Sequence, residues 1–170
     1  MHTVYYPSYT GTLEHDARAH FAYVAQQTGG KMYYGSQDWH RLLAEEIACL
    51  AAHAAVDVVF VVDLTGSMSA HIGDVKAKLK SLVDSVPSGL DVRFGLGSHR
   101  DYPRYYSSYG YSAYYGYTGD WAWRRHLDLT TDRDAVKSAI DSLPPTGGGG
   151  DAPECYTRAL YECLFFSWRT

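Results

Sequence analysis

The sequence lacks several features that mark common protein classes. It has no apolar run long enough to cross a bilayer, which argues against membrane insertion. Its 15 Lys and Arg residues are outnumbered by 19 Asp and Glu residues and form no basic stripe. This argues against nucleic acid as a partner. The 3 cysteines do not suggest a disulfide framework, so we expect them to be small core residues.

The first residues, 1–11, also lack the charged-then-apolar pattern of a secretion signal. If the chain is complete as given, we therefore expect a cytoplasmic location.

The chain does have two alternating signals: short β-branched or aromatic runs, and longer stretches with helical spacing. This alternation is typical of a layered α/β domain with a mainly parallel sheet. Strands are expected at 2–6, 31–35, 56–63, 91–99 and 121–129. Helices are expected at 13–27, 38–54, 70–86 and 153–168, with a short one that starts in a capping box at Thr131 and Asp134.

We therefore predict a single α/β domain over residues 1–170, with a three-layer, Rossmann-like fold. Its sheet should hold about five mostly parallel strands, with one antiparallel edge strand and helices on both faces.

The strand expected at 56–63 ends abruptly in polar residues. Asp63 closes the strand, and Thr65 and Ser67 follow at alternating positions on the turn into the next helix. Ligands of such sheets bind beyond the carboxyl ends of the strands, so these three side chains can converge there. Hard oxygen ligands suit Mg²⁺ or Mn²⁺ rather than zinc. The alternative is that Thr65 and Ser67 only cap the helix.

The segment "DLTGSMS", which starts at Asp63, resembles the Asp-x-Ser/Thr-x-Ser signature of von Willebrand factor A (vWA) domains, their metal-ion-dependent adhesion site (MIDAS). The segment "GGGGDAPE", 147–154, resembles a loop of the subgroup that includes integrin β-subunit I-like and hemicentin-like vWA domains. This resemblance implies that Glu154 is a further ligand of the metal.

The segment "VRFGLGSHRDYP", which contains Asp101, resembles the second strand of the same subgroup. The resemblance implies an adjacent Ca²⁺ held by Asp101, Asp151 and the carbonyl of Pro153, with Glu154 shared. The alternative for Asp101 is a surface turn, or an ion pair with Arg100 or Arg104.

The family's order is changed in this chain. Residues 1–54 resemble the C-terminal part of a vWA domain and 55–170 its N-terminal part, so the chain resembles a circular permutation. One central strand of the family is missing. We expect strand 2–6 to pair with strand 56–63 in its place; alternatively, a partner chain fills the gap or the exposed strand edges self-associate. An acidic group near the metal is lost with the missing strand, so weaker metal binding is expected.

The stretch 102–117 holds 8 of the 16 tyrosines of the chain. In the integrin β group the corresponding loop helps to choose the ligand, and tyrosine offers a large contact area at low entropic cost. The alternative is an aromatic hairpin that packs on itself. The tyrosines predicted to bind a ligand are Tyr105, Tyr106, Tyr109, Tyr111, Tyr114 and Tyr115.

The resemblance implies a binding module rather than an enzyme, whose Mg²⁺ or Mn²⁺ engages an Asp or Glu carboxylate of a protein partner. One alternative is a Mg²⁺-dependent phosphatase-like hydrolase, because Asp63 follows a buried strand and Thr65 stands two residues on. Such enzymes want a second acid where Thr65 stands and a downstream lysine, neither of which is placed convincingly. Another alternative is a degenerate vWA scaffold that binds no metal.

Overall fold

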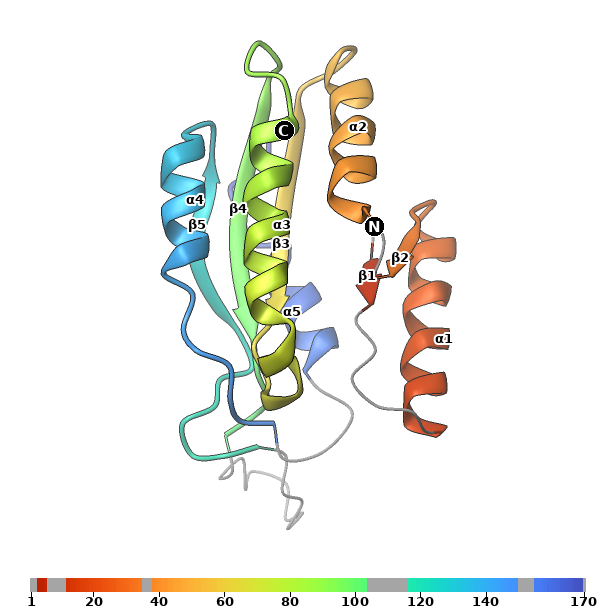
Figure 1. Ribbon diagram of the computed structural model, residues 1–170, viewed down its shortest axis with the longest axis vertical. Coiled ribbons are helices and arrows are strands. Elements are labelled where there is room, and N and C mark those ends of the chain that lie inside the picture. Colours follow the sequence, from red (N-terminus) through yellow and green to blue (C-terminus); the bar gives the residue numbers. More distant parts are fainter. Residues whose placement is uncertain (1–2, 6–11, 35–37, 104–115, 150–154, 170) are drawn as a thin grey trace.

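The computed structural model describes residues 3–5, 12–34, 38–103, 116–149 and 155–169 (Figure 1). The described strands and helices form an α/β structure. None of the described helices is long and apolar enough to cross a bilayer.

The main sheet is a mixed sheet of three strands in the order β3-β4-β5. Strand β3 (Val56–Asp63) pairs in parallel with β4 (Val92–His99) over its full length, from Val56 opposite Val92 to Asp63 opposite His99. Strand β5 (Arg124–Thr130) runs antiparallel to β4. The antiparallel edge strand predicted at 121–129 is thus confirmed, with its start three residues later.

Helices cover both faces of this sheet. In Figure 1, α3 (Ile72–Ser85) and α4 (Arg133–Asp141) stand in front of the strands, α2 (Trp39–Ala51) stands to the side of β3, and α5 (Tyr156–Cys163) lies behind the strands. A short 3₁₀ helix, η1 (Gly66–Ala70), connects β3 to α3. The carboxyl end of β3 therefore opens into a tight turn rather than directly into a long helix.

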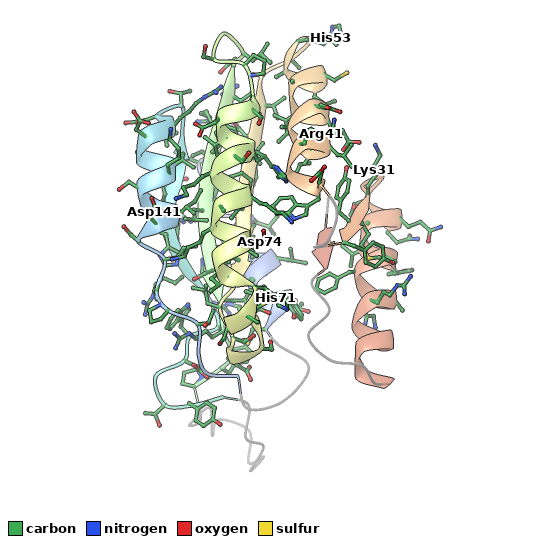
Figure 2. The ribbon with its side chains drawn as sticks, in the orientation of Figure 1. Lys31, Arg41, His53, His71, Asp74 and Asp141 are labelled. Carbon is green, nitrogen blue, oxygen red and sulfur yellow. The ribbon has the colours of Figure 1, made fainter. Side chains whose placement is uncertain are left out.

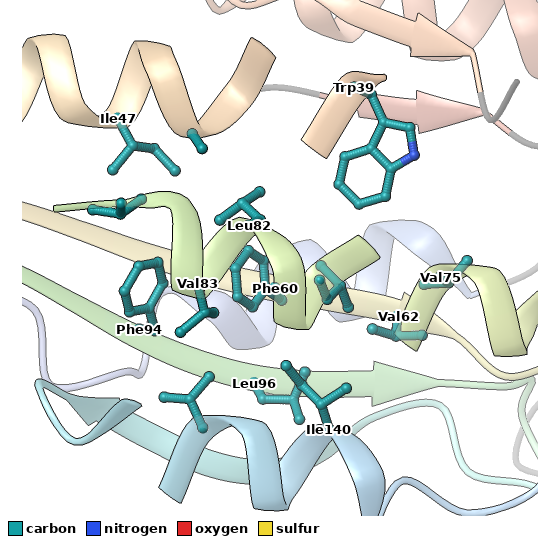
Figure 3. Close-up of a cluster of buried hydrophobic side chains, with 14 of the residues drawn as sticks. Trp39, Ile47, Phe60, Val62, Val75, Leu82, Val83, Phe94, Leu96 and Ile140 are labelled. Atoms are coloured by element: carbon teal, nitrogen blue, oxygen red, sulfur yellow. The ribbon is translucent and has the colours of Figure 1, made fainter. Parts of the chain in front are cut away.

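The core lies between the sheet and the front helices (Figure 3). Phe60 of β3 and Phe94 of β4 stack with their ring centroids 5.8 Å apart. Leu82 and Val83 of α3 and Ile140 of α4 are fully buried against them. Full burial of one such side chain stabilises the fold by about 1.5–3 kcal/mol. This packing fixes β3 and β4, and with them the polar residues at their ends.

The five-stranded sheet that the sequence predicts is not what the structure has, since its strands form a three-stranded and a separate two-stranded sheet. Strand β1 (Thr3–Tyr5) pairs in parallel with β2 (Met32–Tyr34), with helix α1 (Thr12–Gln27) between them in the chain. The expected pairing of strand 2–6 with strand 56–63 is therefore wrong for the described residues. A helical crossover between parallel strands is a local unit, whereas pairing with β3 would close a much longer loop.

Two predicted helices differ in their ends. Helix α4 is capped by Asp132, whose Oδ1 accepts hydrogen bonds from the backbone of Asp134 and Ala135 at 3.1 and 3.0 Å, and not by Thr131. The helix predicted at 153–168 ends at Cys163, because the following residues form turns with hydrogen bonds to the residue three positions earlier. The indole of Trp168 also donates to the Cys163 carbonyl at 2.8 Å.

Candidate metal centre

Asp63, Thr65 and Ser67 lie together at the carboxyl end of β3. The backbone N–H of Thr65 donates to Asp63 Oδ1 at 2.8 Å, and the Thr65 hydroxyl donates to the same oxygen at 2.7 Å. The hydroxyls of Thr65 and Ser67 are 3.1 Å apart. Thr65 is buried, Asp63 is partly buried and Ser67 is exposed. The three oxygen-bearing side chains that the sequence singled out therefore form one connected group with a face towards solvent.

The helix-cap interpretation of these hydroxyls is not what the structure has. Thr65 is the N-cap residue of η1, yet its side chain makes no capping hydrogen bond. The N-cap of α3 is His71, which Figure 2 labels at the lower end of that helix. The Thr65 hydroxyl is instead directed at a carboxylate, which places two oxygen atoms of different residues 2.7 Å apart. Carboxylate and other hard oxygen atoms are the ligand types that Mg²⁺ prefers.

The glycine-rich loop is held against the same turn by the main chain. Gly147 N–H donates to Leu64 O, and Gly66 N–H donates to Gly148 O, both at 3.0 Å. The hydroxyls of Ser69 and Thr146 are 2.9 Å apart. Residues 63–69 and 146–149, far apart in the sequence, therefore form one compact corner of the molecule.

Asp120 is a residue of this corner that the sequence reasoning missed. It is 7% exposed, and its Oδ2 accepts from the backbone N–H of Gly149 at 3.0 Å and of Tyr117 at 2.8 Å. Gly148 has a φ of 75°, and a Cβ built there would overlap the Asp120 carboxylate. The loop thus needs glycine at 148 to pass over Asp120. A lone acid between Gly119 and Trp121 gives no sequence signal beyond that of an ordinary turn.

Asp101, the candidate for a second cation, is 1% exposed. Its Oδ1 accepts from the Tyr102 backbone at 2.6 Å and from the Cys155 thiol at 3.1 Å. Its Oδ2 is buried without a hydrogen-bond partner among the described residues. The surface-turn interpretation is therefore wrong. Arg100 does not pair with it in the described structure; that guanidinium contacts Asp120 at 3.5 Å and donates to Pro145 O at 2.6 Å.

The start of α5 contacts both candidate acids. The Tyr156 hydroxyl donates to Asp63 Oδ2 at 3.3 Å, while the thiol of its neighbour Cys155 reaches Asp101. The ring of Tyr156 also packs edge-to-face on His99 of β4, with centroids 4.9 Å apart. Sequence reasoning did not single out Tyr156, because the residue gains its role only through the return of α5 to the sheet.

Several predicted site residues lie outside the described residues. They are Glu154, Asp151 and Pro153 of the expected metal sites, and Tyr105, Tyr106, Tyr109, Tyr111, Tyr114 and Tyr115 of the expected binding loop. Among the side chains with described positions, no group of three or more His, Cys, Asp or Glu residues could hold a metal ion. Asp63 thus brings hydroxyls, but no second described carboxylate, to its site.

The cysteines are all free, as expected. Cys155 is buried. At Cys163, burial raises the pKa of the thiol to about 11, so the Cys163 thiol stays protonated at neutral pH. Cys49 is exposed on α2, which corrects its expected place in the core.

Comparison with known proteins gives no family to set beside this geometry. No family model matches the chain, and no curated protein matches it.

Proposed function

We propose that the chain is a metal-dependent protein-binding module of vWA type. In this proposal Asp63, Thr65 and Ser67 hold Mg²⁺ or Mn²⁺ at the carboxyl end of β3. The observation that carries it is a connected set of one carboxylate and two hydroxyls. The Thr65 hydroxyl lies 2.7 Å from Asp63 Oδ1 and 3.1 Å from the Ser67 hydroxyl. Because the hydroxyls are neutral, the cation keeps much of its positive charge and attracts an Asp or Glu carboxylate of a protein partner.

Glu154 is proposed as the ligand that completes this site. Its support is the position of the next two residues, since Cys155 and Tyr156 contact the carboxylates of Asp101 and Asp63. A second carboxylate would give the cation the charged ligand that the described residues do not provide.

An adjacent Ca²⁺ is proposed at Asp101, with Asp151 and the Pro153 carbonyl. The support is the buried Asp101 Oδ2, which has no hydrogen-bond partner in the part of the chain that is described. A buried carboxylate oxygen is costly to leave unpaired, and a cation would satisfy it.

The wider architecture is proposed on the same basis. We regard residues 1–170 as one permuted vWA domain in which the family's single sheet is divided by the loss of a central strand. The tyrosines of the 102–117 stretch are proposed to contact the partner, because this stretch follows Asp101 at the carboxyl end of β4.

Calorimetric titration with MgCl₂ and MnCl₂ tests the metal site. Binding heat is expected for the unchanged chain, and Asp63→Ala and Glu154→Gln should each abolish it. Asp74→Asn is the matched control, because Asp74 lies in the first turn of α3 and forms an ion pair with Lys78, so the substitution should leave the heat unchanged. Equal heats from the unchanged chain and Asp63→Ala would overturn the proposal.

The remaining alternatives give different results in the same experiment. A degenerate scaffold would show no heat, and no shift of melting temperature with either cation. A hydrolase would release phosphate from a generic phosphomonoester in a way that Asp63→Ala stops. The described residues provide no support for the hydrolase, since Asp63 is contacted by Thr65 and Tyr156 and not by a lysine.

A further inference from the structure

Strand β3 lies at the edge of the three-stranded sheet, with β4 on one side. On its other side the structure describes no strand, although Figure 1 shows α2 and the β1–β2 pair beyond that edge. An edge strand presents a row of unpaired backbone N–H and C=O groups, and another polypeptide can pair with them. The sequence and register of β3 show whether this edge is protected against such pairing.

The hydrogen bonds at both ends of β3 identify the groups on the open edge. Val56 N–H donates to Asp91 O and Leu64 N–H donates to His99 O, both at 2.9 Å. Backbone groups of successive residues in a strand point to opposite sides, so the even-numbered residues of β3 bond to β4. The odd-numbered residues therefore direct their N–H and C=O groups outward: Asp57, Val59, Val61 and Asp63.

The opposite edge of the sheet has the protection that β3 lacks. Strand β5 carries Arg124, Arg125 and Asp128, and its register with β4 shifts twice. Charged side chains and irregular pairing are the usual defences of an exposed edge. Strand β3 reads VDVVFVVD and keeps one register over all eight residues, with no Lys or Pro and with charged residues only near its ends, of which Asp57 is ion-paired with Arg93 and Arg169. By this comparison β5 is suited to face water and β3 is suited to be covered.

We propose that the outer edge of β3 binds an extended apolar segment of another polypeptide chain, which joins the sheet as an added strand. The faces of β3 define the chemistry of this segment. Phe60 and Val62 are buried on one face, and Val59 is only partly buried on the other, beside Gly95 and Phe166. A neighbouring strand would share both faces, so it should be rich in Val, Ile and Thr.

A second copy of β3 is a poorer occupant than a foreign segment. In the antiparallel register that pairs residues 57–63 of the two copies, Asp57 of one copy would lie opposite Asp63 of the other. Like charges directly opposite destabilise a strand pair. A whole second copy would also have to meet α2 and the β1–β2 pair, which Figure 1 shows beyond this edge.

The test uses a fluorescein-labelled peptide with the sequence Lys-Lys-Thr-Val-Ile-Val-Ile-Val-Thr-Lys-Lys, and a control peptide whose central Val is Pro. Anisotropy titrations should show saturable binding of the first peptide only. Val61→Pro removes one outward N–H without touching the bonds to β4 and should weaken binding by about tenfold or more. Val61→Thr keeps that N–H and the β-branched shape, so it is the matched control and should bind normally.

If Val61→Pro does not fold, residue-resolved hydrogen exchange of the unchanged chain tests the proposal in its place. Without peptide, the amides of Val59 and Val61 should exchange about tenfold or more faster than those of Phe60 and Val62. With peptide, the exchange of Val59 and Val61 should slow. Equal exchange of odd and even amides without peptide, or no slowing with it, would overturn the proposal.

Two further outcomes are distinguished by design. Sedimentation that shows dimers of the chain alone, with Val59 and Val61 protected in them, would replace the foreign segment by a second copy and overturn the proposal. Peptide binding should be the same in EDTA and in Mg²⁺, because this edge does not depend on the metal site. Binding that needs Mg²⁺ would assign the peptide to the metal site and also overturn the proposal.

Discussion

Asp101 and Asp120 are both buried beside the carboxyl end of β4, with 1% and 7% of their surfaces exposed. Asp120 Oδ2 accepts from two backbone N–H groups, and its Oδ1 faces the Arg100 guanidinium. Asp101 accepts through Oδ1 only, and its Oδ2 has no partner among the described residues. Similar burial thus leads to two different arrangements: Asp120 holds the glycine-rich loop in place, and Asp101 has one oxygen without a partner among the described residues.

The largest expected effect on stability concerns the glycine-rich loop that Asp120 holds. Gly148→Ala should destabilise the fold by about 3 kcal/mol or more, because the added Cβ meets the Asp120 carboxylate and φ is positive. Gly29→Ala is the matched control, since Gly29 has a φ of 66° with no atom within 4 Å of the added Cβ. It should cost about 1–2 kcal/mol in a urea titration. Equal losses for the two variants would mean that the loop does not depend on Asp120.

Removal of the two charges in turn should change stability in opposite directions. In EDTA, Asp120→Asn should lower the free energy of unfolding by about 1–3 kcal/mol, because the amide –NH2 only donates and would face either the Arg100 guanidinium or the two backbone N–H groups, where carboxylate oxygens now accept. Asp101→Asn should raise it by about 1 kcal/mol, because it removes a buried charge whose second oxygen has no described partner. Urea titrations of both variants measure the two changes.

Added Ca²⁺ sharpens the same comparison. Saturation at a hundredfold excess over the dissociation constant should stabilise the unchanged chain by about 2.7 kcal/mol, and Asp101→Asn should lose this gain while Asp120→Asn keeps it. Should Asp101→Asn also be less stable in EDTA, Asp101 would be a structural acid like Asp120.

The smallest expected effect is a pH dependence of stability that comes from His126. It has to be subtracted before the Asp101 and Asp120 variants are compared at low pH. Burial, and then the charge of Arg124, lower the pKa of His126, whose Nε2 lies 2.7 Å from the Ser98 hydroxyl. The unfolded chain therefore binds this proton more readily than the folded chain does. The stability contribution is fully present above the unfolded pKa of about 6.5 and is lost as the pH falls below it towards the folded pKa.

His126→Gln should flatten that part of the stability profile, measured by urea titration between pH 7 and pH 5. An unchanged slope would mean that groups other than His126 take up the proton.

The sequence predicted much of the local structure around these acids. The apolar run of β3, the helical spacing of α3 and the polar turn between them are local patterns, and each formed as expected. The connection of Asp63 with Thr65 and Ser67 was also predictable, because all three lie in one five-residue turn, 63–67. The cap of α4 was missed by one residue, since Thr131 and Asp132 are both able to accept the same N–H groups.

Long-range pairing was less predictable. The expected pairing of strand 2–6 with strand 56–63 rested on the need to cover an apolar edge, but β1 pairs with β2 through the nearby crossover. Asp120 and Tyr156 gave no signal, because each acquires its partners only when distant segments meet.

The sequence by itself determined which residues bring side-chain oxygens to the end of β3 and which runs become strands and helices, since periodicity and turn chemistry act between near neighbours. Only the tertiary structure decided which buried acid is satisfied, which strand edge stays open and what the start of α5 contacts. These depend on chain segments tens of residues apart, whose approach is set by the packing of the shared core rather than by any local pattern.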